Sequence, residues 1–580
     1  MKKKSSSFIF WSVLFTTMAL TLLLHLLLYP STLVEVEAEG FFVSTPDFIQ
    51  HTLQQPTGLT LWGTYFLEHL FVEAYYGSLL IILLCLSASV AFYLLWRKSS
   101  LTQLTPVATI ALFLYLALVV FTDVFALLSA NLVLWAFGIY SHLSRPVGKI
   151  LFTALLPLGY LLLPFPLLVL VGIGYALVNL RQDKGIVLFC CTLIYTTFLF
   201  ALPPIWSQYV CYLGPEHLFT APSLHPLPLP LYVILAASLL HLIPAGKLNA
   251  FLNKINIKVQ IVLILCAGIA FSYTFANHPD RQQKEALCVL EHAAEAEDWN
   301  RVLHLYHNEL EKDAFTLRYA LLAEAGLSTL PHHLLNYPIS SAEDFVFRHN
   351  YSIRADHFNS LFYRHLGFPD ESFHQAFEGS TLSPRGFTMR SLRMFTDASL
   401  AVGDTSLAQK YIDILNTTCT HGEWAAQKTV LLKALTHGEI VVSPAPLRSF
   451  NFVGAAPTLT TEWTYALDAH PNNRRLFDYL ACAFLLNKQP EKLARLMELT
   501  HTYERQTLPP LYAQAMALFA EGRPQWQGRF IVPSEVVQEW NYCQQLHQQR
   551  RMQELAQRTR GTYWYYLFFV NNRPSSPARF

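Results

Sequence analysis

The sequence predicts an all-α protein: a polytopic transmembrane helix bundle with about nine spans, followed by a soluble α-solenoid. Two observations predict this division. Residues 1–278 hold 12 Lys and Arg and 9 Asp and Glu, whereas residues 279–580 hold 29 and 31. Long apolar runs recur in the first part, and one soluble core cannot bury so many of them. The second part instead shows paired amphipathic helical patterns with short polar turns. A wholly soluble protein is therefore excluded.

The apolar runs define the order of the spans. Lys2, Lys3 and Lys4 precede the first run, which is longer than the core of a cleavable signal peptide, so we expect it to be retained. The prolines at 157, 164 and 166 leave open whether the fifth and sixth runs form two spans or one re-entrant hairpin. The predicted spans are 8–29, 78–96, 104–121, 124–142, 150–163, 165–180, 186–203, 231–246 and 259–277.

The basic residues of the first part predict the orientation. With the N-terminus in the cytoplasm, all 12 Lys and Arg of residues 1–278 fall in cytoplasmic loops, as the positive-inside rule requires. An odd number of spans then places residues 279–572 outside, and residues 573–580 form a tail that we expect to be disordered. Either interpretation of the segment 150–180 preserves this sidedness.

The outer loop 30–77 is predicted to contain helices lying at the membrane surface. In residues 59–76 the polar groups recur at helical spacing, with Thr60, Thr64 and Glu68 followed by His69 and Glu73. A shorter helix is expected over residues 47–55, before the break at Pro56-Thr-Gly58.

The second part resembles tetratricopeptide repeats. Helical patterns turn at Leu366-Gly367, at Gly403-Asp404 and at Leu486-Asn487, with small residues in the following helix. The two glycine turns lie 36 residues apart. The resemblance implies stacked helical hairpins that bind a peptide, a protein or another part of the same chain. The aromatic segment Tyr563 to Val570 is expected to be the last helix of the stack, with docking onto the membrane domain as the alternative.

Several function classes are excluded or disfavoured. No glycine-rich nucleotide motif and no nucleophile elbow is present, and neither part carries the basic stripe that nucleic-acid binding needs. The nine cysteines lack zinc-ribbon or Cys-x-x-Cys spacing. His25 and His241 are the ionisable groups inside apolar runs, and we interpret both as packing residues, which disfavours an ion relay and leaves a transporter as a distant third hypothesis.

The acidic residues of the outer loop are the candidates for chemistry. Glu35, Glu37 and Glu39 alternate directly after the first span, and Asp47 follows. The arrangement resembles the GT-C class of polytopic glycosyltransferases, whose first outer loop carries an acidic base followed by surface helices. The resemblance implies Asp47 as base, with Glu39 and Glu37 as second choices for base or as ligands of a divalent cation.

The same resemblance implies a polyprenyl-phosphate-linked sugar as donor. Glu68, His69 and Glu73 would then contact substrate. The departing phosphate is an anion and needs a cation nearby, which a bound metal, Arg281 and Lys284, or a basic group further along the second part would supply. No other cofactor is implied. An acidic surplus in an outer loop also follows from topology alone. The alternative is therefore a non-catalytic scaffold that recruits a periplasmic protein through its helical repeats.

The chain also resembles an uncharacterised bacterial family of polytopic membrane proteins with a helical-repeat C-terminal domain. The matching segments include residues 41–48, Pro56 to Gly77, Ser383 to Gly403, and Gly561 to Tyr566. The resemblance implies a bacterial inner membrane with the C-terminal domain in the periplasm, and brings no established activity.

Overall fold

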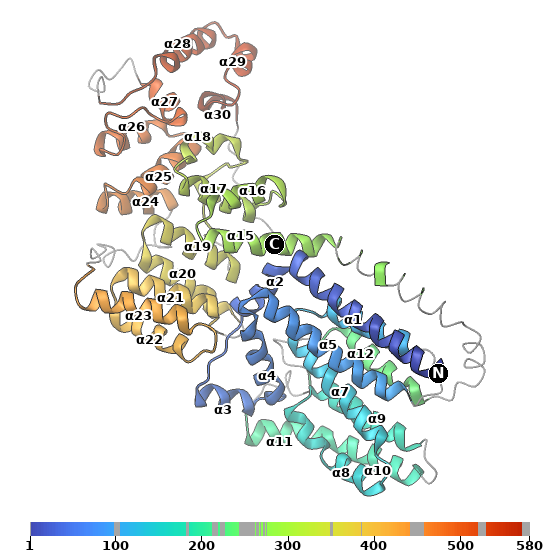
Figure 1. Ribbon diagram of the computed structural model, residues 1–580. Helices are drawn as coiled ribbons and strands as arrows, with labels where there is room; N and C mark the ends of the chain where they lie inside the picture. The colour runs from blue at the N-terminus through green and yellow to red at the C-terminus, as the bar shows by residue number, and fades with distance from the viewer. Residues whose placement is uncertain are drawn as a thin grey trace. The chain divides into compact units, whose positions relative to one another are not determined.

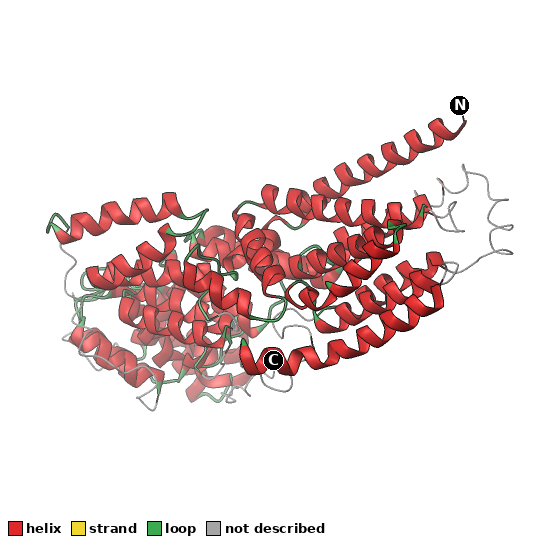
Figure 2. Cartoon of the chain, turned by 90° about the horizontal axis from the view of Figure 1, so that it is seen from below, coloured by secondary structure: helices red, strands yellow, loops and turns green. Residues whose placement is uncertain are grey.

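The computed structural model is built from helices (Figures 1 and 2). It describes residues 2–97, 105–180, 185–211, 219–220, 227–242, 277–348, 352–383, 386–440, 458–519 and 529–570, with isolated residues between 262 and 275. Within those ranges no strand occurs, and the β-type pairing is one isolated bridge between Thr507 and Ile531. The all-α prediction is confirmed for this part of the chain.

Two compact units divide the chain. Unit 1 comprises residues 1–285 together with two short later segments, 388–390 and 413–426. Unit 2 comprises residues 286–387, 391–412 and 427–580. The two later segments of unit 1 matter for the candidate site, because they bring residues from the predicted helical-repeat half against the predicted outer loop.

The helices of unit 1 pack around one continuous apolar core. The core runs from Phe10 in α1 to Phe275, and α5 packs on α6 and α7 while α9 packs on α10. The helices are α1 (Lys2–Leu28), α2 (Pro30–Ala38), α3 (Pro46–Gln54), α4 (Gly58–His69), η1 (Leu70–Val72), α5 (Ala74–Trp96), α6 (Thr105–Val119), α7 (Val124–His142), α8 (Pro146–Ala154), η2 (Leu156–Leu161), α9 (Phe165–Leu180), α10 (Gly185–Phe198), η3 (Leu199–Ala201), α11 (Leu202–Tyr209), α12 (Leu229–Ala237) and η5 (Ser238–Leu242).

Among the described residues, four helical segments are long and apolar enough to cross a membrane. They are Phe10–Leu28, Ala74–Trp96, Val124–His142 and Gly185–Tyr209, and α6 and α9 are shorter apolar helices. This is fewer than the nine predicted spans. The predicted span 259–277 lies almost entirely outside the described residues.

Two predicted spans are not single helices. The segment 150–163 is divided between α8 and the 3-10 helix η2, with Pro157 inside η2, because proline cannot donate the backbone hydrogen bond that a continuous α-helix needs. The segment 231–246 contains the end of α12 and the 3-10 helix η5. Neither segment is one continuous α-helix in its described residues, which end at residue 242 for the second segment; for the first, the prolines had left a re-entrant hairpin open as the alternative to a span.

His25 is a packing residue, as the sequence predicts. Its ring is fully buried, with Nδ1 3.1 Å from the hydroxyl of Ser78 and Nε2 2.7 Å from the carbonyl oxygen of Ala117. The side chain of His241 lies outside the described residues.

Unit 2 contains the predicted helical hairpins. α19 ends at Leu366 and Gly367 follows with φ +82°, a left-handed conformation that glycine adopts without steric cost. Gly403, with φ +80°, separates α21 from α22 in the same way. The helices are α15 (Pro279–Glu295), α16 (Trp299–Asn308), α17 (Ala314–Gly326), α18 (Leu330–His333), η6 (Leu334–Asn336), η7 (Ala342–Asp344), α19 (Ile353–Leu366), α20 (Pro369–Leu382), α21 (Met389–Val402), α22 (Thr405–Asn416), α23 (Gly422–Thr436), α24 (Leu459–Ala469), α25 (Arg474–Leu486), α26 (Pro490–Leu499), α27 (Pro510–Ala517), α28 (Ser534–Gln548), α29 (Met552–Arg558) and α30 (Tyr563–Phe569).

The aromatic C-terminal segment forms α30 and packs within unit 2. Trp564 is buried against Trp540, and its indole N–H donates to the carbonyl oxygen of Gln514 at 2.9 Å. The contacts of Trp564 agree with a last helix that covers its own domain. The tail 573–580 lies outside the described residues.

Candidate functional site

Helix α2 directs two carboxylates into unit 1 in different directions. It begins at Pro30, whose fixed φ suits the first turn of a helix. Successive residues of an α-helix are rotated by about 100°, so side chains two positions apart point to nearly opposite sides. Glu35 and Glu37 are both buried, whereas Glu39 is exposed. The alternating acids therefore meet different partners.

Glu35 pairs with Arg390, the second residue of α21. Both side chains are buried, and the guanidinium donates two hydrogen bonds to the carboxylate, at 2.6 and 2.7 Å. The backbone N–H of Met389 also donates to the carbonyl oxygen of Gly40 at 2.9 Å. A bidentate pair in a low-dielectric interior fixes the position of the segment 388–390 on α2.

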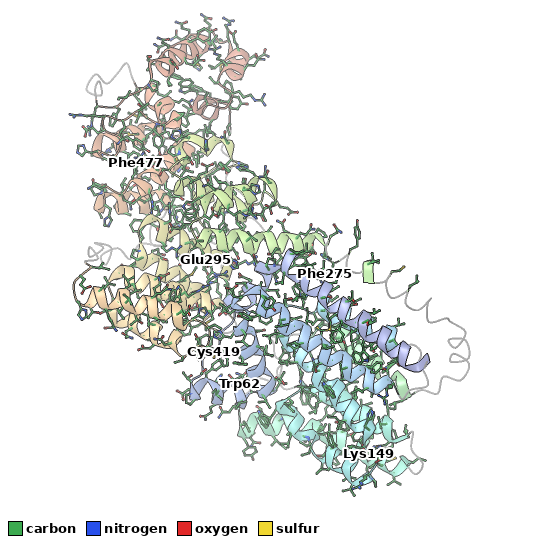
Figure 3. All side chains as sticks on the ribbon, viewed as in Figure 1. Trp62, Lys149, Phe275, Glu295, Cys419 and Phe477 are labelled. Atoms are coloured by element: carbon green, nitrogen blue, oxygen red, sulfur yellow. The ribbon has the colours of Figure 1, made fainter. Side chains whose placement is uncertain are left out.

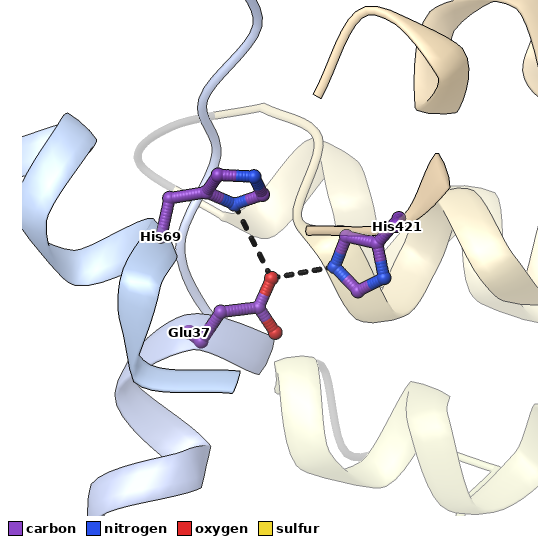
Figure 4. Close-up of side chains that lie close together, drawn as sticks. All are labelled: Glu37, His69 and His421. Atoms are coloured by element: carbon purple, nitrogen blue, oxygen red, sulfur yellow. Dashed lines mark hydrogen bonds and ion pairs between the residues drawn. The ribbon is translucent and has the colours of Figure 1, made fainter. Parts of the chain in front are cut away.

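Glu37 lies between two histidines (Figure 4). Its Oε1 atom is 2.6 Å from Nε2 of His421 and 3.4 Å from Nδ1 of His69. All three residues are less than 5% exposed. One ligand-type atom from each residue lies within 4.8 Å of the others. The cluster therefore joins α2, the end of α4 and the segment 413–426, and Glu37 and His421 are 384 positions apart in the sequence.

The sequence around α4 explains the position of His69. Thr57 has φ +59°, and a Cβ on Gly58 would collide with the carbonyl oxygen of Thr52, so the chain turns sharply before α4. The hydroxyl of Thr60 donates to the carbonyl oxygen of Leu162 at 2.6 Å. These contacts fix α4, and His69 is its last residue.

Aromatic rings cover one side of His69. The ring of Phe42 lies 5.7 Å from the imidazole and packs against Phe66 and Trp62 of α4; Figure 3 labels Trp62.

His421 is positioned by its own backbone: its N–H donates to the hydroxyl of Thr418, and its carbonyl oxygen accepts from the N–H of Ala425 in the first turn of α23.

Asp47 lies apart from this cluster, at the start of α3. Its side chain is exposed, and the preceding Thr45 caps the helix by accepting a hydrogen bond from the N–H of Phe48. Helix α3 also lines an apolar groove of about 590 Å³, formed with α11 by Ile49, Leu53, Trp206 and Val210 among others. The indole N–H of Trp206 donates to the carbonyl oxygen of Gln54 at 2.9 Å and holds α11 on α3.

The other predicted site residues are distributed over unit 1. Glu68 is buried, and Glu73 is exposed before α5. Arg281 donates to the carbonyl oxygen of Leu118 at 2.6 Å and lies 4.7 Å from the ring centre of Phe275, whereas Lys284 is exposed. The structure brings Glu37 and His69 together, and leaves Asp47 and Glu39 open to solvent.

Three residues of unit 1 were missed by sequence reasoning. Arg390 and His421 lie in the predicted solenoid, where no local pattern separates them from surface residues. Glu285 accepts hydrogen bonds from the backbone N–H groups of Ser31 and Thr32 and so caps the start of α2. The negative charge of Glu285 suits the N-terminus of α2, but the two are brought together only by the fold, since about 250 positions separate them in the sequence.

A family model described as "Family of unknown function (DUF6057)" matches residues 2–570. No curated protein matches the chain. No solved structure matches it either.

Proposed function

Because the chain belongs to the DUF6057 family, whose function is unknown, we propose a function from the arrangement of its residues. We propose that it is a membrane-embedded glycosyltransferase that moves a sugar or glycan from a polyprenyl-linked donor to an acceptor at the outer face. The observation that carries the proposal is the apolar groove beneath α3, the helix that also presents Asp47 to solvent. A groove lined by Ile49, Leu53 and Val210 suits an isoprenoid tail.

The contacts within unit 1 support the predicted sidedness. Glu35 and Glu37 follow α1, whereas Arg390 and His421 follow the last predicted span. Because these side chains are in contact, both stretches lie on one side of the membrane, and an even number of crossings separates them. The nine predicted spans meet this condition, because eight of them follow α1 and eight is an even number of crossings.

The broken segment α8–η2 supports a crossing rather than a hairpin. Helix α8 has nine residues and η2 has six. At about 1.5 and 2.0 Å per residue, the two together are about 25 Å long, close to the thickness of the hydrocarbon core. At one end Lys149 lies 5.5 Å from the ring centre of Tyr140, near the end of α7. At the other, the carbonyl oxygen of Tyr160 accepts from the N–H of Thr57, in the loop after α1. The segment thus joins the two ends of the bundle.

In the proposed reaction Asp47 accepts the proton of the acceptor hydroxyl as the sugar leaves its lipid phosphate. The departing phosphate needs a positive charge nearby. Arg281 already donates to a backbone carbonyl and packs on Phe275. Lys284 is exposed, which leaves its ammonium group, or a bound cation, for this role.

The test separates the groove from the base. Full-length protein is purified with its lipids, and co-purifying polyprenyl phosphates are measured by mass spectrometry together with envelope glycans in cells. Asp47→Asn should retain the lipid and lose the glycan product. Leu53→Trp, which fills the groove, should lose both. Asp280→Asn, at an exposed acid in the first turn of α15, is the matched control and should change neither.

Two outcomes would contradict the proposal. A normal glycan profile in cells carrying Asp47→Asn at the wild-type protein level removes Asp47 from the mechanism. Absence of any polyprenyl species from the wild-type protein removes the lipid-linked donor.

The second candidate is a scaffold, and the pairing of Glu35 with Arg390 favours it. The acids nearest to the first span then hold the chain together and perform no chemistry. A scaffold predicts that Asp47→Asn is silent, whereas removal of residues 300–560 abolishes recovery of a crosslinked envelope protein.

A further inference from the structure

We propose that Glu37, His69 and His421 bind a divalent transition-metal ion, with zinc as the best fit. The proposal concerns a site built from residues already in mutual contact, and it does not depend on glycosyl transfer. The three side chains come from α2, α4 and the segment before α23, and all three are buried. Figure 4 shows both imidazole rings directed at the same carboxylate oxygen.

The separations suit a metal after small movements. In a tetrahedral zinc site with bonds of about 2.0–2.1 Å, two ligand atoms lie about 3.3 Å apart. Nδ1 of His69 and Oε1 of Glu37 are 3.4 Å apart, close to that value. Nε2 of His421 is 2.6 Å from the same oxygen, so the imidazole of His421 must withdraw by less than about 1 Å to admit the ion.

The donor set selects the class of metal. Two imidazoles and one carboxylate are the protein ligands of many catalytic zinc sites, in which water takes the fourth position. The same set binds ferrous iron with open positions. Calcium and magnesium prefer sites built from oxygen atoms. Zinc or another first-row transition metal is therefore expected here.

A second layer of contacts orients one ligand. The hydroxyl of Thr420 lies 2.8 Å from Nε2 of His69. If Nε2 carries the proton and donates to Thr420, the lone pair of Nδ1 points to Glu37. A hydrogen bond to the non-ligating nitrogen is the usual feature that fixes the tautomer of a metal-bound histidine.

The metal would join distant parts of the chain. His421 lies 384 residues from Glu37, so one ion would hold the loop after the first span and the segment 413–426 together. Because such a site does not exist in the unfolded chain, the binding free energy would contribute to folding. Without metal, the same groups form a hydrogen-bonded His–Glu–His cluster, and the experiment decides between the two.

The experiment uses the full-length protein in detergent. The metal content is measured by elemental mass spectrometry after purification without added metal. The protein is then stripped with a chelator and titrated with Zn²⁺, and with Co²⁺ as a spectroscopic probe. We expect about one equivalent of metal, a rise in the melting temperature on adding Zn²⁺, and a visible Co²⁺ absorption band.

Matched variants locate the site. His69→Gln and His421→Gln should each lose the retained metal and the Zn²⁺-dependent rise in melting temperature. His51→Gln, which replaces an exposed histidine of α3, should keep both. Thr420→Val keeps the side-chain shape, removes the hydroxyl and should weaken Zn²⁺ binding about 10- to 100-fold.

The wild-type protein alone can overturn the proposal. If it retains no metal and neither Zn²⁺ nor Co²⁺ changes its melting temperature or spectrum, the cluster is a hydrogen-bonded one. If metal binds equally well to wild type and to His421→Gln, the site lies elsewhere. Both outcomes leave the glycosyltransferase proposal standing, because that rests on Asp47 and the groove.

Discussion

Buried carboxylates are satisfied in different ways in the two units. In unit 2, Glu324 accepts hydrogen bonds from the hydroxyls of Thr329 and Tyr337, which lie 5 and 13 residues away. In unit 1, Glu35 takes its partner from a position 355 residues away. Glu324 is therefore held by hydroxyl groups from nearby residues of the chain. The polar groups of unit 1 hold together parts of the chain that are separated by the predicted spans.

Asp478, like Glu324, accepts hydrogen bonds from hydroxyl groups of unit 2. Its Oδ1 accepts from Tyr503 at 2.7 Å and from Tyr512 at 2.9 Å, both on the next segments of the chain. Hydroxyl groups are neutral donors, so this carboxylate has hydrogen bonds without a buried ion pair. The difference implies that substitutions at the distant charge pair of unit 1 destabilise more than substitutions at the local clusters of unit 2.

The largest effect is expected for Arg390→Met. The change leaves Glu35 buried without the guanidinium that neutralises it, and loss of one partner of a buried ion pair costs about 3–5 kcal/mol. The measurement is denaturant unfolding of the full-length protein in detergent micelles. The control is Arg558→Met, which breaks an exposed pair with Glu539 and should leave the unfolding midpoint unchanged. Equal midpoints for Arg390→Met and wild type would contradict the pairing.

The next effect is a pH dependence in unit 2. Burial raises the pKa of Asp478 to about 6, more than the hydrogen bonds from Tyr503 and Tyr512 and the charge of Arg474 lower it. A pKa raised by folding means that the folded state binds the proton more tightly. This contribution to stability is therefore present below about pH 4 and is lost as the pH rises through about 6.

Asp478→Asn should flatten this dependence. The asparagine keeps an acceptor for both tyrosines and cannot ionise. Between pH 4 and 6.5, the free energy of unfolding of wild type should fall relative to the variant by about 2 kcal/mol. Parallel pH profiles for the two proteins would show that Asp478 has the same pKa in the folded and unfolded states.

A smaller effect is expected for Tyr337→Phe. Loss of the hydroxyl removes the 2.7 Å hydrogen bond to Oε1 of Glu324, while Thr329 and His333 still contact Oε2. The expected destabilisation is about 1–2 kcal/mol, the cost of removing one donor from a buried charged acceptor. Thr329→Val offers a second measurement on the same carboxylate. If Tyr337→Phe lowered the free energy of unfolding more than Arg390→Met does, the expectation that the charge pair of unit 1 contributes more to stability than the local clusters of unit 2 would be wrong.

The smallest effect is expected for Thr45→Ala. Thr45 caps α3 through a long hydrogen bond of 3.4 Å, and its removal should cost about 0.5–1 kcal/mol. Thermal unfolding should detect this as a small decrease in melting temperature. The variant also tests whether the position of Asp47 depends on the cap, because a loosened α3 should lower glycan transfer without abolishing it.

The sequence was informative where one local pattern determines the structure. The apolar run 124–142 predicts α7 residue for residue, and Pro56-Thr-Gly58 marks the start of α4. Gly367 and Gly403 mark hairpin turns because their left-handed conformation excludes most side chains. Each of these features depends on residues that are close together in the chain.

The sequence predicted only part of the candidate site, because its residues are far apart in the chain. Glu37 and His69 stood out as acidic and polar residues in an apolar region. His421 lies in a polar stretch of the predicted solenoid, where a histidine carries no pattern of its own. Its role follows from a fold that returns the segment 413–426 to α2. Pro157 marked a possible break in the segment 150–163, but an apolar run alone does not show whether a helix continues through a proline.

A double-mutant cycle on Glu35 and Arg390 tests most directly the claim that the loop after the first span and the segment 388–390 form one unit. Glu35→Gln, Arg390→Met and the double variant are compared with wild type by unfolding in the same detergent. The structure predicts a coupling free energy of about 1.5–3 kcal/mol, so the double variant should be less destabilised than the sum of the two single variants. Strict additivity would contradict the claim, because two side chains that do not meet cannot be coupled.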